Sequence, residues 1–558
     1  MEEILSKKSR EKIILLGNEA IVRGALESGV QFVSTYPGTP SSEIGNTFFR
    51  IAPKANVYFE FSTNEKVALE AAIGASFSGL KCLMAMKNFG TNVALEPLLP
   101  FVYTGSKGPT VIISADDPSC HSSAQSEENT RAISYLAHIP TLEPADPQEC
   151  KDFVKLAFQI SEKFKIPVMI RTTTRVAHQK MPVELGKIKN NDLRIKKGKF
   201  VKDPRKFVTL PPRVMEMKEE LLEKVEKIGN FAEKSYINRQ SSKKSNYGII
   251  TSGISYLYVM EALKELNLDL PVLKLGFFYP LPEEKIKHFI KKAKKILIVE
   301  ELEPFLEKEV KILAKEVNCK LEVVGKKLIP EVNELTPGIV ISAIAKFTNK
   351  KYKISSTSLK IKPPKRFPQL CPGCPYWLVV SAIKKAVDIK KVIFGGEIGC
   401  YMLFGNPPVN LQDYLSCMGS SVGIAHGITK STRKKVIAFV GDSSFFHSGI
   451  PPLINTVFNK SNAQAKRRAR DKQSSASPLI IILNNETTAM TGHQPHPGAP
   501  ATPNGINIEN IVKGCGVKYV KTLDPVNQKE FIQTIKEFLE KPEVSVIISK
   551  RPCIQLKK

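Results

Sequence analysis

The chain has 558 residues and a net charge of +28, and hydrophobic residues make up 42% of the sequence. That length and apolar content allow about three or four domains of ordinary size, each with its own core. No apolar run reaches the ~18 residues of a membrane span, and the N-terminus lacks the apolar stretch of a signal peptide. These features predict a cytoplasmic protein that does not enter a membrane.

The strongly basic balance raises the question of nucleic-acid binding. The lysines are scattered along the chain, and no basic motif interleaved with aromatic residues appears. A lysine-rich surface that helps solubility explains most of them. The remainder can attract an anionic cofactor, an acid substrate or an acidic electron carrier. We therefore predict no nucleic-acid partner.

Residues 12–180 alternate between short apolar runs and helical spacing, the pattern of a parallel sheet covered on both faces. The run 32–36 ends in a Pro-Gly-Thr-Pro loop at 37–40, where two prolines around a glycine favour a tight turn. The run 57–61 is followed by Asn-Glu-Lys, so Glu65 opens a helix just beyond a strand end. Ligand loops gather at such strand ends. A carboxylate at a helix N-terminus is also favourable without any function.

The predicted fold class is α/β, with several doubly wound parallel-sheet domains. The boundaries are a first domain at 1–186, a connecting segment at 187–245, a second domain at 246–348, a linker at 349–367 and a last domain at 368–558. The connecting segment contains a predicted helix over 214–228 and a predicted exposed stretch over 233–245. The linker is rich in lysine, serine and proline, a composition typical of a domain boundary.

The last domain contains two β-branched runs that each end at small polar residues. Residues 436–440 lead into Gly441 and Asp442, and residues 479–483 lead into Asn484 and Asn485. Parallel strands of this kind carry ligand loops at their carboxyl ends. Aspartate and asparagine offer the oxygen ligands that Mg²⁺ prefers, with positions left open for a diphosphate. Ordinary turn dipeptides without a ligand are the plainer alternative.

These strings resemble the metal-binding motif of thiamine-diphosphate enzymes. The longer segments 441–453 and 487–497 narrow the resemblance to the large (alpha) subunits of the indolepyruvate ferredoxin oxidoreductase family. The resemblance spans about residues 12–555. It implies a pyrimidine-binding module at 1–186, a transketolase C-terminal-like domain at 246–348 and a diphosphate-binding module at 368–558.

The resemblance also assigns roles to residues of the last domain. It implies that Mg²⁺ is held by the side chains of Asp442 and Asn485 and by the carbonyl of Thr487. The predicted contacts to thiamine diphosphate are Gly441, Asp442, Ser443, Asn485, Thr487, Met490 and Gly419. The small residues after Gly419 suit tight helix packing almost equally well.

The predicted catalytic residues are Glu65, Thr39 and His493. In the resembling family the glutamate faces the aminopyrimidine ring of the cofactor, and the threonine faces the substrate. A turn threonine that satisfies its own backbone is an equally good interpretation of Thr39. Pyruvate-type relatives carry Arg-Gly-Pro where this chain has Asp-Asp-Pro at 116–118, a departure that agrees with an arylpyruvate substrate. The partner of the substrate carboxylate is therefore open, with His121 and Arg131 as candidates.

Four cysteines have the order expected of a metal centre. Cys371 and Cys374 form a Cys-x-x-Cys on a Pro-Gly turn, followed by Cys400 and Cys553. Four thiolates can hold a [4Fe–4S] cluster or a zinc ion. The resemblance and the need for an electron acceptor favour the cluster, with Cys417 and Cys515 as rival ligands. The other cysteines read as buried small hydrophobes or inert thiols: Cys82, Cys120, Cys150 and Cys319.

Two departures from the family stand out. The sequence has no ferredoxin-like run of repeated cysteines after Cys553, which indicates either a separate electron carrier or a truncated record. A polar, basic insertion at 463–477 lengthens the connection between the two ligand loops and predicts an exposed docking loop.

The resulting hypothesis is oxidative decarboxylation of an aryl 2-oxoacid, with indolepyruvate as the leading substrate. The resemblance implies CoA as cosubstrate, ferredoxin as electron acceptor and a smaller beta subunit in a hetero-oligomer. A non-oxidative thiamine-dependent decarboxylase or synthase, which needs no cluster, is the alternative enzyme. A basic nucleic-acid-binding protein with a zinc site is the alternative from another class.

Overall fold

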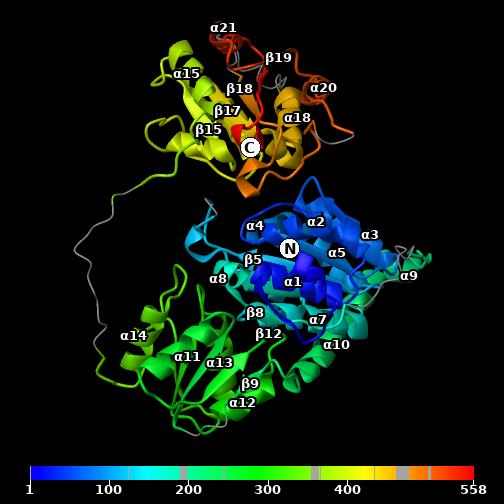
Figure 1. Ribbon diagram of the computed structural model, residues 1–558, viewed down its shortest axis with the longest axis vertical. Coiled ribbons are helices and arrows are strands. Elements are labelled where there is room, and N and C mark those ends of the chain that lie inside the picture. Colours follow the sequence, from blue (N-terminus) through cyan, green and yellow to red (C-terminus); the bar gives the residue numbers. More distant parts are fainter. Residues whose placement is uncertain are drawn as a thin grey trace. The chain divides into compact units, whose positions relative to one another are not determined.

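A computed structural model of the chain describes residues 2–122, 125–188, 198–241, 243, 245–352, 364, 366–432, 434–459, 477–500 and 504–557. The chain divides into two compact units, residues 1–358 and 359–558, and this division falls inside the predicted linker (Figure 1). The basic insertion lies outside the described residues except for Ser477. Among the described residues, no helix has the length and apolar character needed to cross a membrane.

The larger sheet of the first unit has seven strands in the order β12-β6-β7-β5-β4-β2-β3. All neighbouring strands are parallel except β12, which pairs antiparallel with β6. The strands are β2 (Phe32–Thr35), β3 (Tyr58–Phe61), β4 (Cys82–Lys87), β5 (Thr110–Asp116), β6 (Thr141–Leu142), β7 (Val168–Thr173) and β12 (Phe277–Tyr279). Strands β5 and β7 are buried along their whole length, as expected for a parallel sheet covered on both faces.

Helices cover this sheet and form the main apolar core of the unit with it. Helix α1 packs against α7 and α2, whereas α3 packs against α5. The helices are α1 (Gly17–Glu27), α2 (Ser42–Ala55), α3 (Glu65–Phe77), α4 (Asn88–Val93), α5 (Leu95–Thr104), α6 (Arg131–Ala137), α7 (Pro147–Phe164) and α8 (Thr174–His178). A two-stranded antiparallel ribbon joins β1 (Lys12–Leu16) to β8 (Lys180–Glu184).

The second sheet of the first unit has five strands in the order β14-β13-β10-β11-β9. They are β9 (Arg239–Gln240), β10 (Tyr247–Ser252), β11 (Val272–Leu275), β13 (Lys295–Val299) and β14 (Glu322–Val324). Helix α11 packs on α14 and helix α12 on α13. Their bounds, with those of the connecting helices, are α9 (Pro204–Phe207), α10 (Arg213–Glu233), α11 (Ser255–Glu265), α12 (Glu283–Ile290), α13 (Phe305–Val317) and α14 (Pro337–Phe347).

The predicted helix at 214–228 is confirmed as part of α10, but the prediction that 233–245 is an exposed linker is wrong in part. Ile237 is fully buried and Asn238 nearly so. The Asn238 side-chain oxygen accepts hydrogen bonds from the backbone N–H groups of Gly276 and Phe277. Residues 239–240 then form β9, the edge of the second sheet.

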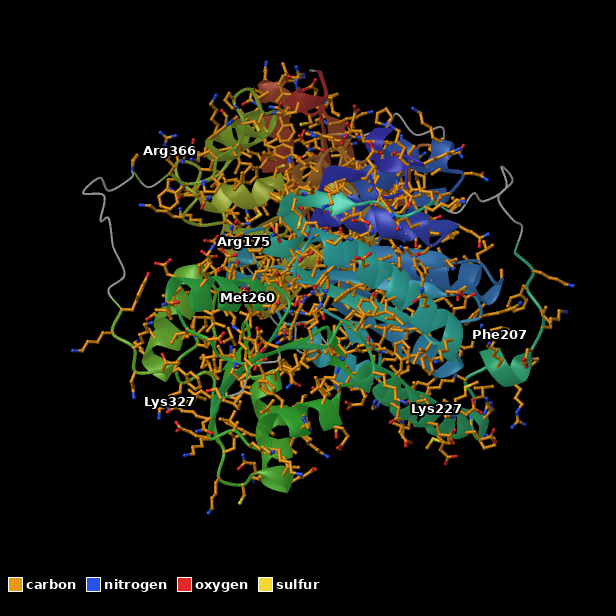
Figure 2. All side chains as sticks on the ribbon, turned by 60° about the horizontal axis from the view of Figure 1, so that its bottom comes forward. Arg175, Phe207, Lys227, Met260, Lys327 and Arg366 are labelled. Atoms are coloured by element: carbon orange, nitrogen blue, oxygen red, sulfur yellow. The ribbon has the colours of Figure 1, made fainter. Side chains whose placement is uncertain are left out.

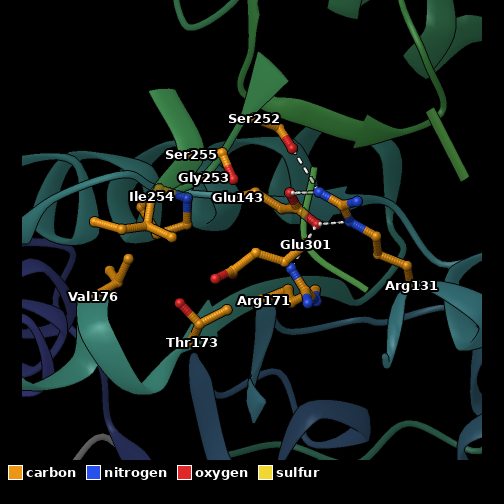
Figure 3. A pocket seen from close by; sticks show the side chains of 11 residues that line it. Arg131, Glu143, Arg171, Thr173, Val176, Ser252, Gly253, Ile254, Ser255 and Glu301 are labelled. Carbon is orange, nitrogen blue, oxygen red and sulfur yellow. Dashed lines mark hydrogen bonds and ion pairs between the residues drawn. The ribbon is translucent and has the colours of Figure 1, made fainter. Parts of the chain in front are cut away.

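A buried ion network joins the two sheets of the first unit (Figure 3). The Arg131 guanidinium donates two hydrogen bonds of 2.7 Å to the carboxylate of Glu143 and one of 2.8 Å to Glu300. Arg171 donates to Asp116 at 2.6 Å and to Glu143 at 3.2 Å. Arg131 thus links the two sheets, whereas the partners of Arg171 both lie at the seven-stranded sheet. Breaking a buried pair of this kind typically costs about 3–5 kcal/mol.

The second unit is built on one six-stranded parallel sheet in the order β16-β15-β17-β18-β20-β19. Its strands are β15 (Ile393–Gly396), β16 (Tyr414–Leu415), β17 (Val436–Gly441), β18 (Leu479–Asn484), β19 (Tyr519–Leu523) and β20 (Ser545–Lys550). Helix α15 packs with α21, and α16 packs with α18. The helices are α15 (Tyr376–Ala386), α16 (Ser420–Thr432), α17 (Asp442–Ser444), α18 (Ile450–Phe458), α20 (Ile508–Gly514) and α21 (Gln528–Phe538). The α/β class with several parallel sheets is confirmed.

Candidate functional site

The carboxylate of Asp442 ties together the ends of two neighbouring strands in the second unit. One oxygen, Oδ2, accepts hydrogen bonds from the backbone N–H groups of Asn485 at 3.0 Å and Glu486 at 2.8 Å. The other oxygen accepts from the N–H of Ser443 at 2.8 Å. Asp442 follows β17, and Asn485 follows β18, which pairs with β17 in parallel register. The sequence placed these residues at two strand ends, and the structure brings them into contact.

The loop after β18 folds back on itself over this carboxylate. Thr488 and Gln494 form a β-bridge, and the Thr488 hydroxyl donates a 3.0 Å hydrogen bond to Ser443. The loop returns His496 to the strand end, where its Nε2 lies 3.1 Å from Asp442 Oδ2. That ring nitrogen is buried without hydrogen-bond geometry to any partner among the described residues. A buried nitrogen of this kind marks a place where a further polar group can complete the site.

Oxygen donors at this strand end suit a hard cation. Asp442, Asn485 and Thr487 are all nearly buried, and the Asn485 side-chain oxygen faces the Thr487 N–H at 3.3 Å. Carboxylate, amide and carbonyl oxygens are the ligands that Mg²⁺ uses beside phosphate groups. The residues present therefore fit the predicted metal, and Ser443 lies in the same corner.

A buried chain of hydrogen bonds supports the backbone beside Asp442. The Gly441 N–H donates to the Tyr401 hydroxyl at 2.8 Å, and that hydroxyl donates to the Glu397 carboxylate at 2.5 Å. The second Glu397 oxygen accepts from the Gly419 N–H. Burial raises the pKa of Glu397 to about 7, while its hydrogen bonds oppose the shift. One fully buried carboxylate thus sets the positions of two predicted cofactor contacts.

Gly419 is required as glycine for two independent reasons. Its φ is +77°, a left-handed conformation that side chains other than glycine rarely adopt. A Cβ on Gly419 would also lie 2.4 Å from the Ser448 carbonyl oxygen. The start of α16 consequently approaches the segment after β17 closely, which fits both predicted roles of Gly419, cofactor contact and helix packing.

The four predicted cluster cysteines lie close enough together for neighbouring thiols to affect the pKa values of Cys374 and Cys400. Burial, together with the neighbouring thiols of Cys374, Cys553 and Cys371, raises the pKa of Cys400 to about 12. Burial likewise raises the pKa of Cys374 to about 11, with contributions from Cys371 and Cys553. Neither rival thiol, that of Cys417 or Cys515, contributes to either shift. Cys553 also contacts the loop after β18, because its N–H donates to the Asn485 carbonyl at 3.0 Å.

In the described part of the chain, no group of three or more His, Cys, Asp or Glu side chains is close enough to hold a metal ion. His493 is exposed, and its Nε2 lies 3.8 Å from the Cys553 sulfur. Met490 is 45% exposed on the same loop.

Of the cysteines predicted to be inert, Cys82 and Cys150 are buried, Cys120 is partly buried and Cys319 is exposed.

The first unit carries its own cluster of polar residues at the carboxyl end of the seven-stranded sheet. Asn64 caps α3 by accepting from the Val67 N–H at 2.9 Å, and Glu65 in the first turn is only 5% exposed. An exposed carboxylate that merely favours the helix is therefore the wrong interpretation of Glu65. The Thr39 hydroxyl lies 3.4 Å from the hydroxyl of Ser42 at the start of α2.

The two candidate partners for a substrate carboxylate are both engaged elsewhere. Arg131 is nearly buried in the ion network between the sheets. His121 Nε2 lies 3.1 Å from the Glu334 carboxylate. That carboxylate also accepts from Arg175, which is labelled in Figure 2. The charge of Arg131 is compensated within the protein, so the partner of the substrate carboxylate stays open.

Sequence reasoning missed Tyr401, Glu397 and His496. Glu397 could have been found by the same rule that selected Asp442, because it directly follows the end of β15. Tyr401 and His496 lie 40 residues before Gly441 and 54 residues after Asp442, so no local spacing connects them to the site.

Comparison with known proteins identifies the class of fold. Residues 23–235 match a family model described as pyruvate flavodoxin/ferredoxin oxidoreductase, thiamine diphosphate binding. Residues 397–464 and 472–549 match one described as thiamine pyrophosphate enzyme, C-terminal TPP binding domain. These matches include Glu65 in the first unit and Asp442 in the second, so both polar strand ends belong to thiamine-diphosphate-binding modules.

Proteins that align with nearly the whole chain identify its family within this class. The chain is 42% identical over 568 residues to indolepyruvate oxidoreductase subunit IorA of Methanothermobacter thermautotrophicus, covering 99% of this chain and 89% of that protein. IorA of Archaeoglobus fulgidus is 40% identical over 99% of this chain and 88% of its own, and IorA of Pyrococcus horikoshii is 41% identical, at 99% and 87%. The chain belongs to the family of indolepyruvate oxidoreductase IorA subunits.

Replacing Tyr401 by phenylalanine tests the hydrogen-bond chain beside Asp442. The buried Gly441 N–H would lose its acceptor, so we expect the free energy of unfolding to fall by about 1–3 kcal/mol and thiamine diphosphate to bind more weakly with Mg²⁺. Thermal unfolding and calorimetric titration measure the two effects. Tyr414→Phe is the matched control, because it removes a hydroxyl that donates to the Ser421 carbonyl instead. Equal cofactor affinity in both variants would exclude Tyr401 from the site.

Proposed function

We propose that this chain is the thiamine-diphosphate-binding subunit of an enzyme that oxidatively decarboxylates aryl 2-oxoacids, with indolepyruvate as substrate. CoA captures the acyl group and ferredoxin accepts the electrons. The observation that carries the proposal is the Asp442 corner, where a buried carboxylate, oxygen donors and the unsatisfied His496 nitrogen meet at two strand ends. The IorA relatives support the choice of substrate.

The second unit binds the charged end of the cofactor. Asp442, Asn485 and the carbonyl of Thr487 would hold Mg²⁺, and Gly441 would contact the diphosphate through its backbone, since the Tyr401 ring fills the space of its missing side chain. Hydrogen bonds from the N–H groups of Asn485 and Glu486, just after the next strand, hold the Asp442 carboxylate in place at this corner. Ser443, Met490 and Gly419 provide further contacts to the cofactor.

The first unit supplies the groups that act on the ring and the substrate. Thiamine diphosphate, when bound, would contribute a nucleophilic carbon and an electron sink for the bonding pair that stays behind when CO₂ leaves. Glu65 holds a proton against the aminopyrimidine ring and so promotes removal of the proton from that carbon. Thr39 and His493 are the further catalytic residues, and Thr39 orients the substrate through its hydroxyl.

The four cysteines hold a [4Fe–4S] cluster, which takes up electrons singly. Support comes from the contributions of the neighbouring thiols to the raised pKa values of Cys374 and Cys400, and from the hydrogen bond between the Cys553 N–H and the Asn485 carbonyl. Thiols with raised pKa values are protonated at neutral pH, so binding of iron must release protons. The redox step favours the oxidative reaction over a non-oxidative decarboxylase, which needs no cluster. A smaller beta subunit completes the hetero-oligomer.

The metal role of Asp442 is tested by Asp442→Ala. We expect the variant to lose Mg²⁺-dependent retention of thiamine diphosphate, because the carboxylate is the only charged oxygen donor in the proposed set. Bound thiamine is measured after gel filtration with and without Mg²⁺. Asp524→Ala, which removes an exposed carboxylate paired with Arg551, is the control and should retain the cofactor. Unchanged thiamine content in Asp442→Ala would remove Asp442 from the metal.

Glu65→Gln tests the proposed proton transfer. The amide keeps the size of the side chain but not its acidity, so cofactor affinity should stay within about threefold while exchange of the thiazolium C2 proton slows by at least 10²-fold. Proton NMR in deuterated buffer measures that exchange. Glu70→Gln, on an exposed position of the same helix, should exchange at the normal rate. Normal exchange in Glu65→Gln would leave Glu65 with a structural role.

Cys553→Ser tests the cluster. Loss of one of four ligands should lower the iron and sulfide content of anaerobically purified protein and weaken its broad visible absorption. Cys515→Ser is the matched control, since Cys515 contributes to neither thiol pKa described above. Full iron content in Cys553→Ser together with loss in Cys515→Ser would reverse the assignment.

A further inference from the structure

The loop after β18 returns a histidine to the strand end that carries the proposed metal ligands. His496 lies between Pro495 and Pro497. Proline restricts its own backbone and that of the residue before it, so both neighbours limit the conformation of this segment. The β-bridge between Thr488 and Gln494 closes the loop just before it. His496 is only 6% exposed, although it belongs to a loop and not to a helix or strand.

Contacts on two sides of the imidazole ring fix its orientation. The Gly498 N–H donates to His496 Nδ1 at 3.1 Å, and the His496 and Phe446 ring centroids are 6.0 Å apart. A Cβ on Gly498 would lie 2.7 Å from Phe446 Cε2, so a larger residue there would displace that ring. The Ala499 N–H donates to the His496 carbonyl at 2.9 Å and closes the turn. The sequence around His496 therefore holds its ring in a defined place.

The hydrogen bond at Nδ1 determines which ring nitrogen carries the proton. An imidazole nitrogen that accepts a hydrogen bond has no proton of its own, so the proton of His496 resides on Nε2. This N–H group lies 3.1 Å from Asp442 Oδ2. It is buried, and it has no partner with hydrogen-bond geometry in the part of the chain that the structure describes. His496 thus provides a buried donor beside a proposed metal ligand.

The Asp442 carboxylate is poorly placed to use this donor. Each carboxylate oxygen has about two lone-pair directions. The backbone N–H groups of Asn485 and Glu486 already donate to Oδ2, at 3.0 Å and 2.8 Å. Leaving a buried donor without an acceptor costs about 1–3 kcal/mol. The Nε2–H group of His496 therefore favours a further acceptor that binds at this corner.

An anionic phosphate oxygen is the acceptor that fits this corner best. The oxygens of Asp442, Asn485 and Thr487 form the proposed Mg²⁺ site, and a bound divalent cation outweighs the charge of one carboxylate. Magnesium binds phosphate groups together with one or two protein carboxylates. Because the His496 N–H lies beside one of the proposed metal ligands, a phosphate oxygen on the metal comes within its reach.

We propose that His496 binds the diphosphate of the cofactor by donating its Nε2–H to a phosphate oxygen beside the metal. This inference rests on the proposed function and adds a residue that lies outside the metal-binding motif. His496 acts on binding alone and takes no part in the proton transfer assigned to Glu65.

Replacing His496 tests the contact with two probes that use the same metal. The full-length chain is titrated calorimetrically with thiamine diphosphate and with inorganic pyrophosphate, each with Mg²⁺. His496→Phe keeps an aromatic ring but has no donor, so both probes should bind about tenfold more weakly or worse, as expected for losing a hydrogen bond to a charged group. His496→Gln should recover part of the affinity, because its amide can donate from a similar position. His426→Phe, which removes a partly buried histidine of α16, is the control and should bind both probes normally.

The Mg²⁺ concentration separates a phosphate contact from a role in holding Asp442. If His496 only positions the metal-binding carboxylate, excess Mg²⁺ should restore the affinity of His496→Phe, and that result would overturn the inference. A loss that persists at saturating Mg²⁺ supports the direct contact. Exchange of the thiazolium C2 proton in the fully loaded variant should stay within about threefold of wild type, because Glu65 is unchanged.

NMR of the wild-type protein carries the test if neither variant folds. In long-range proton–nitrogen spectra of histidine-labelled protein, one histidine protonated on Nε2 alone should shift when Mg²⁺ and pyrophosphate are added. Absence of any such response would overturn the inference, as would unchanged affinity in a folded His496→Phe variant. Wild-type protein that binds no thiamine diphosphate in the presence of Mg²⁺ would instead contradict the proposed function.

Discussion

The hydrogen bonds between the Asp442 carboxylate and the backbone of the next strand are the constraint on which the second unit depends. They hold the end of β17 against the end of β18, and they keep a negative charge in a nearly buried position. A buried carboxylate is costly unless it is hydrogen-bonded, and here three N–H groups compensate for its lost hydration. The backbone of these two loops therefore fixes the position of the Asp442 carboxylate.

The short segment 396–401 contributes to two parts of the second unit. Glu397 and Tyr401 support the backbone at Gly419 and Gly441, and Cys400 between them lies within reach of the other three cluster thiols. Because the segment directly follows strand β15, its position is set by the sheet. The proposed cluster and the proposed diphosphate site are thus built on one rigid element, which favours a constant separation between them.

Much of this arrangement follows from sequence rules, and the exceptions have physical reasons. Apolar runs ending in polar residues identified β17, β18 and the Asp442 corner, because strand ends in parallel sheets converge at one edge. Through-space partners such as Tyr401 could not be predicted, since strand order is not encoded in local periodicity. Ile237 was missed because a single apolar residue in a polar stretch gives no period, yet it is fully buried.

The pairing of β12 with β6 has a consequence for how the first unit is made. Residues 277–279 complete the edge of a sheet whose other strands all precede residue 174. During synthesis this edge stays unpaired until about a hundred residues beyond β7 have left the ribosome, and Arg131 meets Glu300 only 169 residues later in the chain. An expression fragment that ended near residue 245 would lack both β12, the partner of β6, and Glu300, the partner of Arg131. An open strand edge invites aggregation, so the first 358 residues form the smallest sensible unit for separate production.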